Sequence, residues 1–202
     1  MVIFNTKRIL KLTFILCISF ILQTGYSQRF KASAVFGLNV SQIDGDNLYG
    51  FSKLGLTGGV KLAYPLRDNI DVNLEMLYSQ RGSTSGFGFG SEPDIYTDMQ
   101  YIELPLYISI KDWYFEEEGY HKVRAHAGLS FGNLFGVDSS SGVISNDIDT
   151  YNRTDISYLL GVGYNFTKQL GLTIRFTRSF NSLYKANNAI GYFVTTRAEF
   201  KF

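Results

Sequence analysis

The chain has 202 residues, of which 45% are hydrophobic and 16% aromatic, and its formal net charge is +1. A charge so close to zero excludes a strong electrostatic affinity for nucleic acid. The single cysteine, Cys17, lies in the N-terminal segment, so disulfides, thiol catalysis and cysteine-based metal sites are excluded from the rest of the chain.

The N-terminal segment has the features of a secretory signal peptide. Three basic residues precede an apolar run over residues 12–22, and the small residues Gly25 and Ser27 stand at the spacing that a signal peptidase reads. This run of 11 residues is much shorter than the roughly 20 that a membrane-spanning helix needs. We therefore expect residues 1–27 to be removed before Gln28, which leaves a mature chain with a net charge of −2.

The rest of the chain contains eight segments in which apolar and polar residues alternate. Val72, Leu74 and Met76, for example, alternate with Asn73 and Glu75. Successive side chains of a strand point to opposite sides, so each segment predicts a strand with one apolar and one polar face. The predicted strands, in chain order, cover residues 30–40, 54–64, 70–78, 102–110, 123–131, 156–164, 170–176 and 192–202.

The apolar face of these segments carries no charged residue, and its least apolar members are Gly58, Thr196 and Ala198. A charge on a lipid-facing position near the bilayer midplane costs about 2–4 kcal/mol, which explains the exclusion. The pattern predicts an all-β fold: an eight-stranded antiparallel up-and-down transmembrane β-barrel of the bacterial outer membrane, with residues 28–202 as one domain. The alternative is a secreted soluble barrel of the lipocalin type.

The predicted connections alternate in length when the N-terminus is placed in the periplasm. Outer loops then cover residues 41–50, 82–99, 132–154 and 180–191, and inner turns cover 65–69, 111–120 and 165–169. Long outer loops and short inner turns are typical of outer-membrane barrels. The 111–120 connection is longer than a usual inner turn, and its Trp113, Tyr114 and Phe115 predict part of an aromatic girdle at the membrane interface.

Four stretches carry a resemblance to a known family. They are FGLNVS (36–41), LYSQRG (77–82), YIELPLYISI (101–110) and the C-terminal RAEFKF. Over residues 28–202 the chain resembles the porin-family, PorT-like outer-membrane β-barrel proteins, most specifically at YIELPL. The resemblance implies a fold and a location more than an activity, although one class of members belongs to a secretion apparatus. Phe200 and Phe202 are similar to the C-terminal signal read by the barrel assembly machinery, which implies that machinery, together with outer-membrane lipid, as partners.

The polar face collects charged residues inside the predicted barrel. The interior of an eight-stranded barrel is just wide enough for its own side chains, and buried charges are tolerated only when they are paired. We therefore predict a salt-bridged plug, and the alternative is an ion or solute path lined by the same residues. The predicted ion network consists of Asp71, Glu75, Glu103, Arg124, Asp155, Arg175, Arg197 and Glu199, with Lys31, Lys53, Lys61, Lys122 and Lys201 on the same face.

Two interior residues raise separate questions. Pro105 cannot donate to a strand ladder, so we expect a local bulge or a missing hydrogen bond beside Glu103. His126 shares the interior with Ser130 and Glu103, and these three residue types are those of a hydrolase-like catalytic trio. A packed, hydrogen-bonded histidine is the expected alternative.

We expect the acidic runs in the connections to form surface turns. Residues 44–46 and 146–149 offer oxygen ligands to calcium, but neither run follows a complete loop motif. The acidic run 116–118 is expected to be a solvated periplasmic turn, and its functional alternative is a docking site for a periplasmic protein.

These expectations describe a non-enzymatic structural or interaction module of the outer membrane, with a periplasmic or surface protein as a further partner. No catalytic, cofactor-binding or metal site is predicted. The alternatives are a small-solute porin and an outer-membrane lipid-modifying enzyme, the latter by fold analogy alone.

Overall fold

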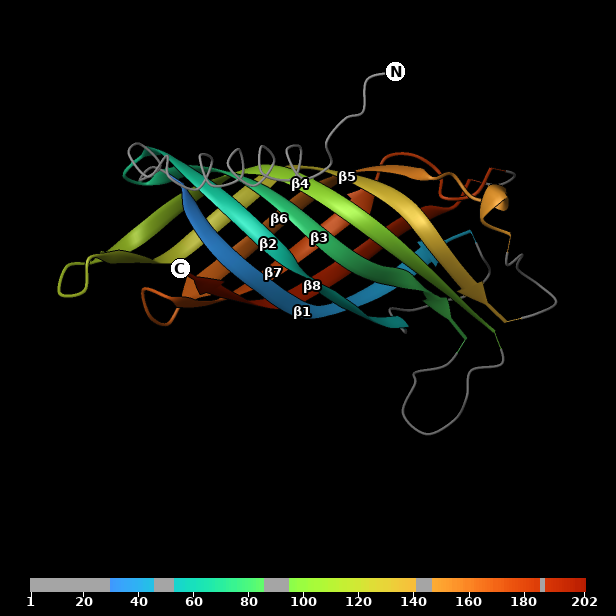
Figure 1. Ribbon diagram of the computed structural model, residues 1–202, viewed down its shortest axis with the longest axis horizontal. Coiled ribbons are helices and arrows are strands. Elements are labelled where there is room, and N and C mark those ends of the chain that lie inside the picture. Colours follow the sequence, from blue (N-terminus) through green and yellow to red (C-terminus); the bar gives the residue numbers. More distant parts are fainter. Residues whose placement is uncertain (1–29, 46–52, 86–94, 141–146, 186–187) are drawn as a thin grey trace, which may run out of the picture. The chain divides into compact units, whose positions relative to one another are not determined.

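The computed structural model describes residues 30–45, 53–85, 95–140, 147–185 and 188–202. Within these ranges, eight antiparallel strands form one closed barrel in which β1 pairs with β8 (Figure 1). This confirms the predicted fold class, whereas the predicted signal peptide lies outside the described residues. The elements are β1 (Lys31–Asp44), β2 (Lys53–Arg67), β3 (Ile70–Thr84), β4 (Tyr96–Phe115), β5 (Tyr120–Ser139), the 3-10 helix η1 (Ile148–Thr150), β6 (Thr154–Asn165), β7 (Leu170–Ser179) and β8 (Ile190–Lys201). No helix in the described ranges is long and apolar enough to cross a membrane.

Inward and outward positions alternate along the strands as the sequence predicts. In β3, Asn73 and Glu75 are only 2% and 1% exposed, whereas Leu74 and Met76 are 48% and 57% exposed. The residues that would form the core of a soluble protein therefore cover the outside of this barrel, where lipid rather than water is their expected surrounding.

The strands are longer than the sequence predicts. β4 and β5 contain 20 residues each, so residues 96–99, 111–115 and 132–139 belong to the ladder rather than to connections. The alternation ends where the apolar band ends, but backbone pairing does not need apolar side chains and continues beyond it. The predicted long turn over 111–120 is wrong for this reason. The actual turn is 116–119, where Gly119 has a φ of 68° and donates its N–H to the Phe115 carbonyl at 2.9 Å.

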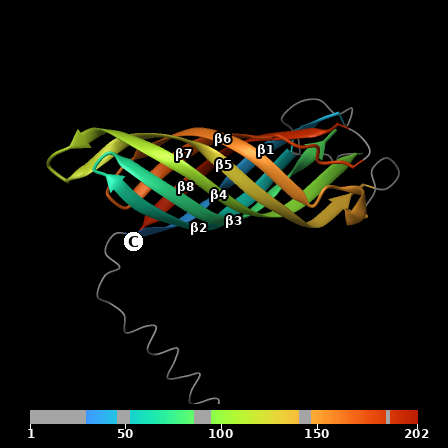
Figure 2. The ribbon, with the colours of Figure 1, turned by 90° about the horizontal axis from the view of Figure 1, so that it is seen from above.

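The two ends of the barrel differ in the length of their connections. The short turns after β2, β4 and β6 lie at one end together with the C-terminus, which identifies this end as periplasmic (Figure 2). Here the β4–β5 hairpin extends beyond the neighbouring turns, because β3 pairs with β4 only up to Ile110 and β6 pairs with β5 only from Val123. Trp113 and Tyr114 on this hairpin are 59% and 55% exposed, as an aromatic girdle requires.

Inward-facing glycines make room for the largest inward side chains. A Cβ atom at Gly128 would lie 2.3 Å from the Leu106 carbonyl oxygen and 2.4 Å from the Tyr107 Cβ on the neighbouring strand. Examples in the ladder are Gly37 opposite Arg197, Gly128 opposite Tyr107, Gly161 opposite Arg175 and Gly163 opposite Arg124.

A closed barrel is expected to change its gel migration on heating. Every strand is paired on both sides, so detergent finds no open edge from which to unravel the ladder. The unboiled outer-membrane fraction should therefore run at a different apparent size from the boiled sample. Recovery of the protein in the soluble fraction with no such shift would instead support the lipocalin-type alternative.

Candidate functional site

The centre of the lumen is occupied by a middle triad, which we define as Glu75, Arg175 and Arg197. Arg175 Nη1 donates to Glu75 Oε2 at 2.9 Å, and Arg197 Nη2 donates to Glu75 Oε1 at 2.6 Å. A second hydrogen bond from each guanidinium group and one from the Tyr107 hydroxyl complete the contacts of this carboxylate. Bidentate pairs of this kind are the strongest ion pairs available to a protein, so one carboxylate on β3 holds β7, β8 and β4 together.

A lower triad of Lys61, Arg124 and Glu199 lies nearer the periplasmic end. Glu199 is one inward position below Arg197 on β8 and pairs with both Lys61 and Arg124. The Ser33 hydroxyl donates to the same carboxylate at 3.2 Å. The Glu199 side chain is fully buried, so it depends on these partners for its charge to be tolerated.

An upper triad of Arg81, Glu103 and Asp155 lies nearer the extracellular end. Arg81 pairs with Glu103 at 2.9 Å and with Asp155 at 2.7 Å. Its guanidinium carbon also lies 4.0 Å from the ring centroid of Tyr101 and 4.6 Å from that of Phe193. The cation is therefore held by two carboxylates and two aromatic rings.

Seven of the eight predicted network residues join these triads, and Asp71 does not. Asp71 pairs with Lys111 at 2.8 Å near the periplasmic rim. The additional lysines also lie near the barrel ends, with the exception of Lys61. Lys31 is exposed, Lys53 pairs with Asp98, Lys122 lies over the Phe115 ring, and Lys201 donates to Asn165. Residue parity predicts which face a side chain occupies, but not how deep in the lumen it lies.

Arg81 is the network residue that the sequence interpretation missed. The predicted third strand ended at residue 78, whereas β3 continues to Thr84. Arg81 stands on the same odd-numbered face as Asn73 and Glu75, and that continued parity was the available signal.

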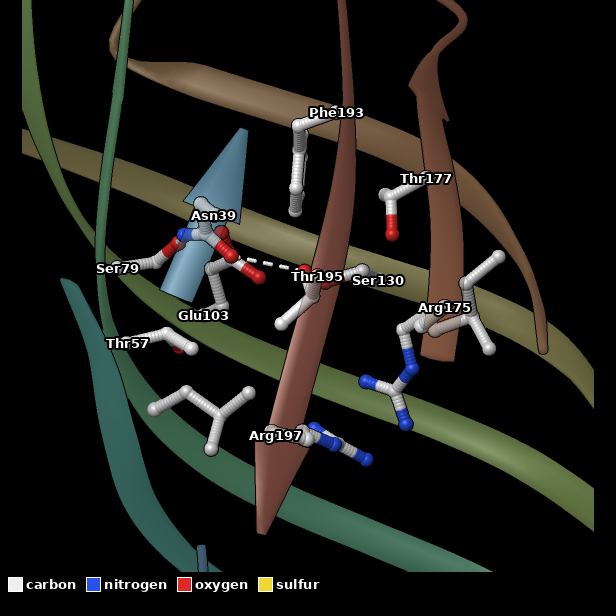
Figure 3. Close-up of a pocket in the computed structure, with 12 residues that line it drawn as sticks. Asn39, Thr57, Ser79, Glu103, Ser130, Arg175, Thr177, Phe193, Thr195 and Arg197 are labelled. Atoms are coloured by element: carbon white, nitrogen blue, oxygen red, sulfur yellow. Dashed lines mark hydrogen bonds between the residues drawn. The ribbon is translucent and has the colours of Figure 1, made fainter. Parts of the chain in front are cut away.

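The space left between the upper and middle triads is very small. Figure 3 shows Asn39 and Ser79 on one side of this cavity and Arg175 on the other, with Thr195 between them on the strand that also carries Arg197. Thr195 donates to Asn39 Oδ1 at 2.8 Å. The cavity has a volume of about 10 Å³. That is room for about one water molecule, far below the roughly 300 Å³ of the smallest ordinary ligand pockets.

An apolar cap closes the extracellular end of the lumen. Tyr151 packs its ring 4.9 Å from the ring of Tyr184, and Leu183 donates its N–H to the Ala189 carbonyl at 2.8 Å. Burial raises the pKa of the Tyr151 hydroxyl, so this group stays neutral in the cap. The cap consists of Ile43, Met99, Tyr101, Leu134, Tyr151, Leu183 and Ala189. It was not predicted, because most of its residues come from strand ends and connections without regular alternation.

His126 packs against Arg175 and Tyr107 inside the barrel. Its Nε2 accepts a hydrogen bond from Arg175 Nε at 3.3 Å, and its ring centroid lies 5.0 Å from that of Tyr107. Glu103 pairs with Arg81 instead. Within the described residues, no hydrogen bond joins His126 to Ser130 or Glu103, so the arrangement is that of a packed histidine.

Pro105 interrupts the ladder on one side only. It pairs regularly with Ser130 of β5. On the β3 side the ladder skips Glu75 and Met76 while keeping its register. The alternative of missing hydrogen bonds therefore applies, and the alternative of a bulge at this position does not.

The acidic runs in the connections form local contacts. Asp147 accepts a hydrogen bond from the Asp149 N–H at 3.0 Å at the start of η1. Arg153 donates to the Asp149 carboxylate at 2.8 Å, which lowers the pKa of that carboxyl. Asp46 and Asn146 lie outside the described residues. Across the described part of the chain, no group of three or more His, Cys, Asp or Glu side chains is arranged to hold a metal ion.

The closed barrel, apolar outside and ion-paired inside, defines an integral protein of the bacterial outer membrane. The family model of the outer membrane protein beta-barrel domain matches residues 23–185, and the chain belongs to this family. The resemblance of the chain to PorT-like proteins stays a prediction. Comparison with curated proteins found no match.

Several solved structures are similar. Neisserial surface protein A has a TM-score of 0.53 at 14% identity, covering 86% of this chain and 97% of its own. Ail of Yersinia pestis has a TM-score of 0.49 at 15% identity, covering 86% and 99%. OprG of Pseudomonas aeruginosa has a TM-score of 0.42 at 13% identity, covering 86% and 95%. At 14% identity, the likeness to the Neisserial protein shows a shared fold and nothing finer.

Proposed function

We propose that this protein is a sealed, non-enzymatic outer-membrane barrel that acts as a structural or interaction module. The observation that carries the proposal is the filling of the lumen, which leaves about 10 Å³ between the upper and middle triads. The exposed connections and the protruding β4–β5 hairpin are then the parts available to partners.

The lumen contacts argue against the two alternatives. A solute path would have to separate bidentate ion pairs that cross the barrel, such as Arg197 with Glu75, and would leave buried charges without partners. A hydrolase would need a nucleophile that hydrogen-bonds to His126. Its Nε2 accepts from Arg175 instead, and among the described residues its buried Nδ1 has no hydrogen-bond partner.

The proposed partners follow from the surface. Lipid surrounds the apolar outer face. The assembly machinery recognises Phe200 near the end of β8 and Phe202 just after it, whose rings lie 5.8 Å apart. The acidic turn 116–118 at the tip of the protruding hairpin is the proposed contact for a periplasmic protein, within a secretion or envelope assembly.

Planar-bilayer recording tests whether the barrel is sealed. We expect no steady conductance after insertion, because the ion pairs of the three triads and the packed cap residues occupy the lumen within the described ranges. A sixteen-stranded porin in the same bilayer provides the conducting control, and heat-dependent gel migration of the reconstituted protein verifies that the barrel is folded. A steady current would contradict the proposal and favour the small-solute porin.

A further inference from the structure

A basic side chain points into the lipid near the extracellular end of the barrel. Arg178 is exposed on the outward face of β7, where Leu172 and Ile174 precede it on the same face. Within the described strands, the only other lysine or arginine that is not on the inward face is Arg67, the last residue of β2.

Aromatic side chains frame Arg178 on four sides. Its direct ladder partners are Tyr158 on β6 and Tyr192 on β8. Phe176 on β7 and Phe180 just after its end flank Arg178, and the Tyr158 ring centroid lies 6.3 Å and 5.3 Å from theirs. Phe180 is still 60% exposed one row nearer the extracellular side, so the charge lies inside the aromatic belt rather than above it.

The described residues supply no counter-ion to this cation, because within those ranges the Arg178 side chain forms no ion pair, hydrogen bond or ring contact. The nearby carboxylate of Asp44 accepts a hydrogen bond from the Tyr192 hydroxyl at 3.0 Å. A lipid-facing charge is costly unless its long side chain reaches the interface or meets an opposite charge there. The anion that such a position meets is the phosphate of a membrane lipid.

We propose that Arg178 is a binding site for the phosphate of an anionic outer-leaflet lipid. The guanidinium group offers two parallel N–H donors that match a phosphate. The hydroxyl of the neighbouring Tyr158 is the second donor, and the aromatic frame contacts the upper part of the acyl chains. This function goes beyond the sealed-barrel proposal and does not depend on it.

The test measures thermal unfolding in nanodiscs made of phosphatidylcholine, with and without a minor fraction of lipid A. Wild-type protein should unfold roughly 2–4 °C higher when lipid A is present, the scale of one charge-assisted contact in a chain of this size. Arg178→Gln should lose this shift, and Arg178→Lys should keep part of it because the charge remains. In phosphatidylcholine alone, Arg178→Gln should unfold no lower than wild type, because it removes an uncompensated lipid-facing charge.

Arg153→Gln is the matched control, because it removes an exposed arginine at the same end of the barrel but off the strands. It should keep the full lipid A shift. The proposal is overturned if Arg178→Gln keeps the wild-type shift, if wild type shows none, or if both glutamine variants lose it equally. An equal shift from inorganic phosphate added to phosphatidylcholine discs would assign the site to free phosphate instead of lipid.

Discussion

Replacing Glu75 with alanine is expected to lower the free energy of unfolding by about 3–5 kcal/mol. The substitution leaves the guanidinium groups of Arg175 and Arg197 buried without a counter-ion, since their side chains are only 4% and 2% exposed. It also removes the acceptor of the Tyr107 hydroxyl. Urea unfolding in lipid vesicles, followed through the fluorescence of Trp113, measures the loss.

Asp71→Ala is the control for this prediction. Asp71 also pairs with a cation inside the barrel, but at the rim, where the side chains of Asp71 and Lys111 are 13% and 14% exposed. Its loss should cost about 1 kcal/mol or less, because water can solvate the remaining lysine. Similar losses for the two variants would show that the middle triad contributes no more than a rim pair.

Gly128→Val is expected to destabilise the barrel by about 3 kcal/mol or to prevent its folding. The new Cβ would lie 2.3 Å from the Leu106 carbonyl oxygen and 2.5 Å from the Tyr107 Cα, both backbone atoms of the neighbouring strand. Backbone in a ladder cannot move aside as a flexible side chain can, so the strands must separate. Heat-dependent gel migration and urea unfolding report the loss.

Gly58→Val makes the same substitution on the outward face. A Cβ at Gly58 would approach only the Phe36 ring and the Val35 carbonyl oxygen, both at 3.4 Å, which is ordinary contact. This variant should fold with nearly unchanged stability, since valine suits both a strand and a lipid-facing surface. Equal damage from the two valines would contradict the steric explanation and indicate a general requirement for glycine.

Side-chain parity made the barrel and its two faces predictable from sequence. A strand has a period of two, so Glu75 and Arg197 could be assigned to the interior without knowing their neighbours. Which charges meet could not be predicted in this way. The depth of each residue in the lumen depends on how far every strand is shifted along its neighbour, summed around the barrel. Asp71 and Glu75 share one face of β3, yet they pair with different elements.

The cap and the strand ends required information that alternation does not carry. Tyr151 and Leu183 stand in connections, and they are buried because those connections turn back over the lumen. In the sequence, the glycines opposite Tyr107 and Arg197 appear only as positions of the polar face that have no polar side chain. Their steric role depends on the cross-strand partner, which becomes known only with the register.

The triads also bear on how the barrel stays shut once it has assembled. Lys61 and Glu199 are 138 residues apart, and Arg197 and Glu75 are 122 residues apart, so no single hairpin can form these pairs. The last strand, β8, supplies both Arg197 and Glu199, which pair with charged residues on β2, β3 and β5. Reopening the seam between β1 and β8 would therefore break ion pairs in the lumen as well as ladder hydrogen bonds. The ion pairs in the lumen therefore help to hold the barrel closed at the seam where the two ends of the sheet meet.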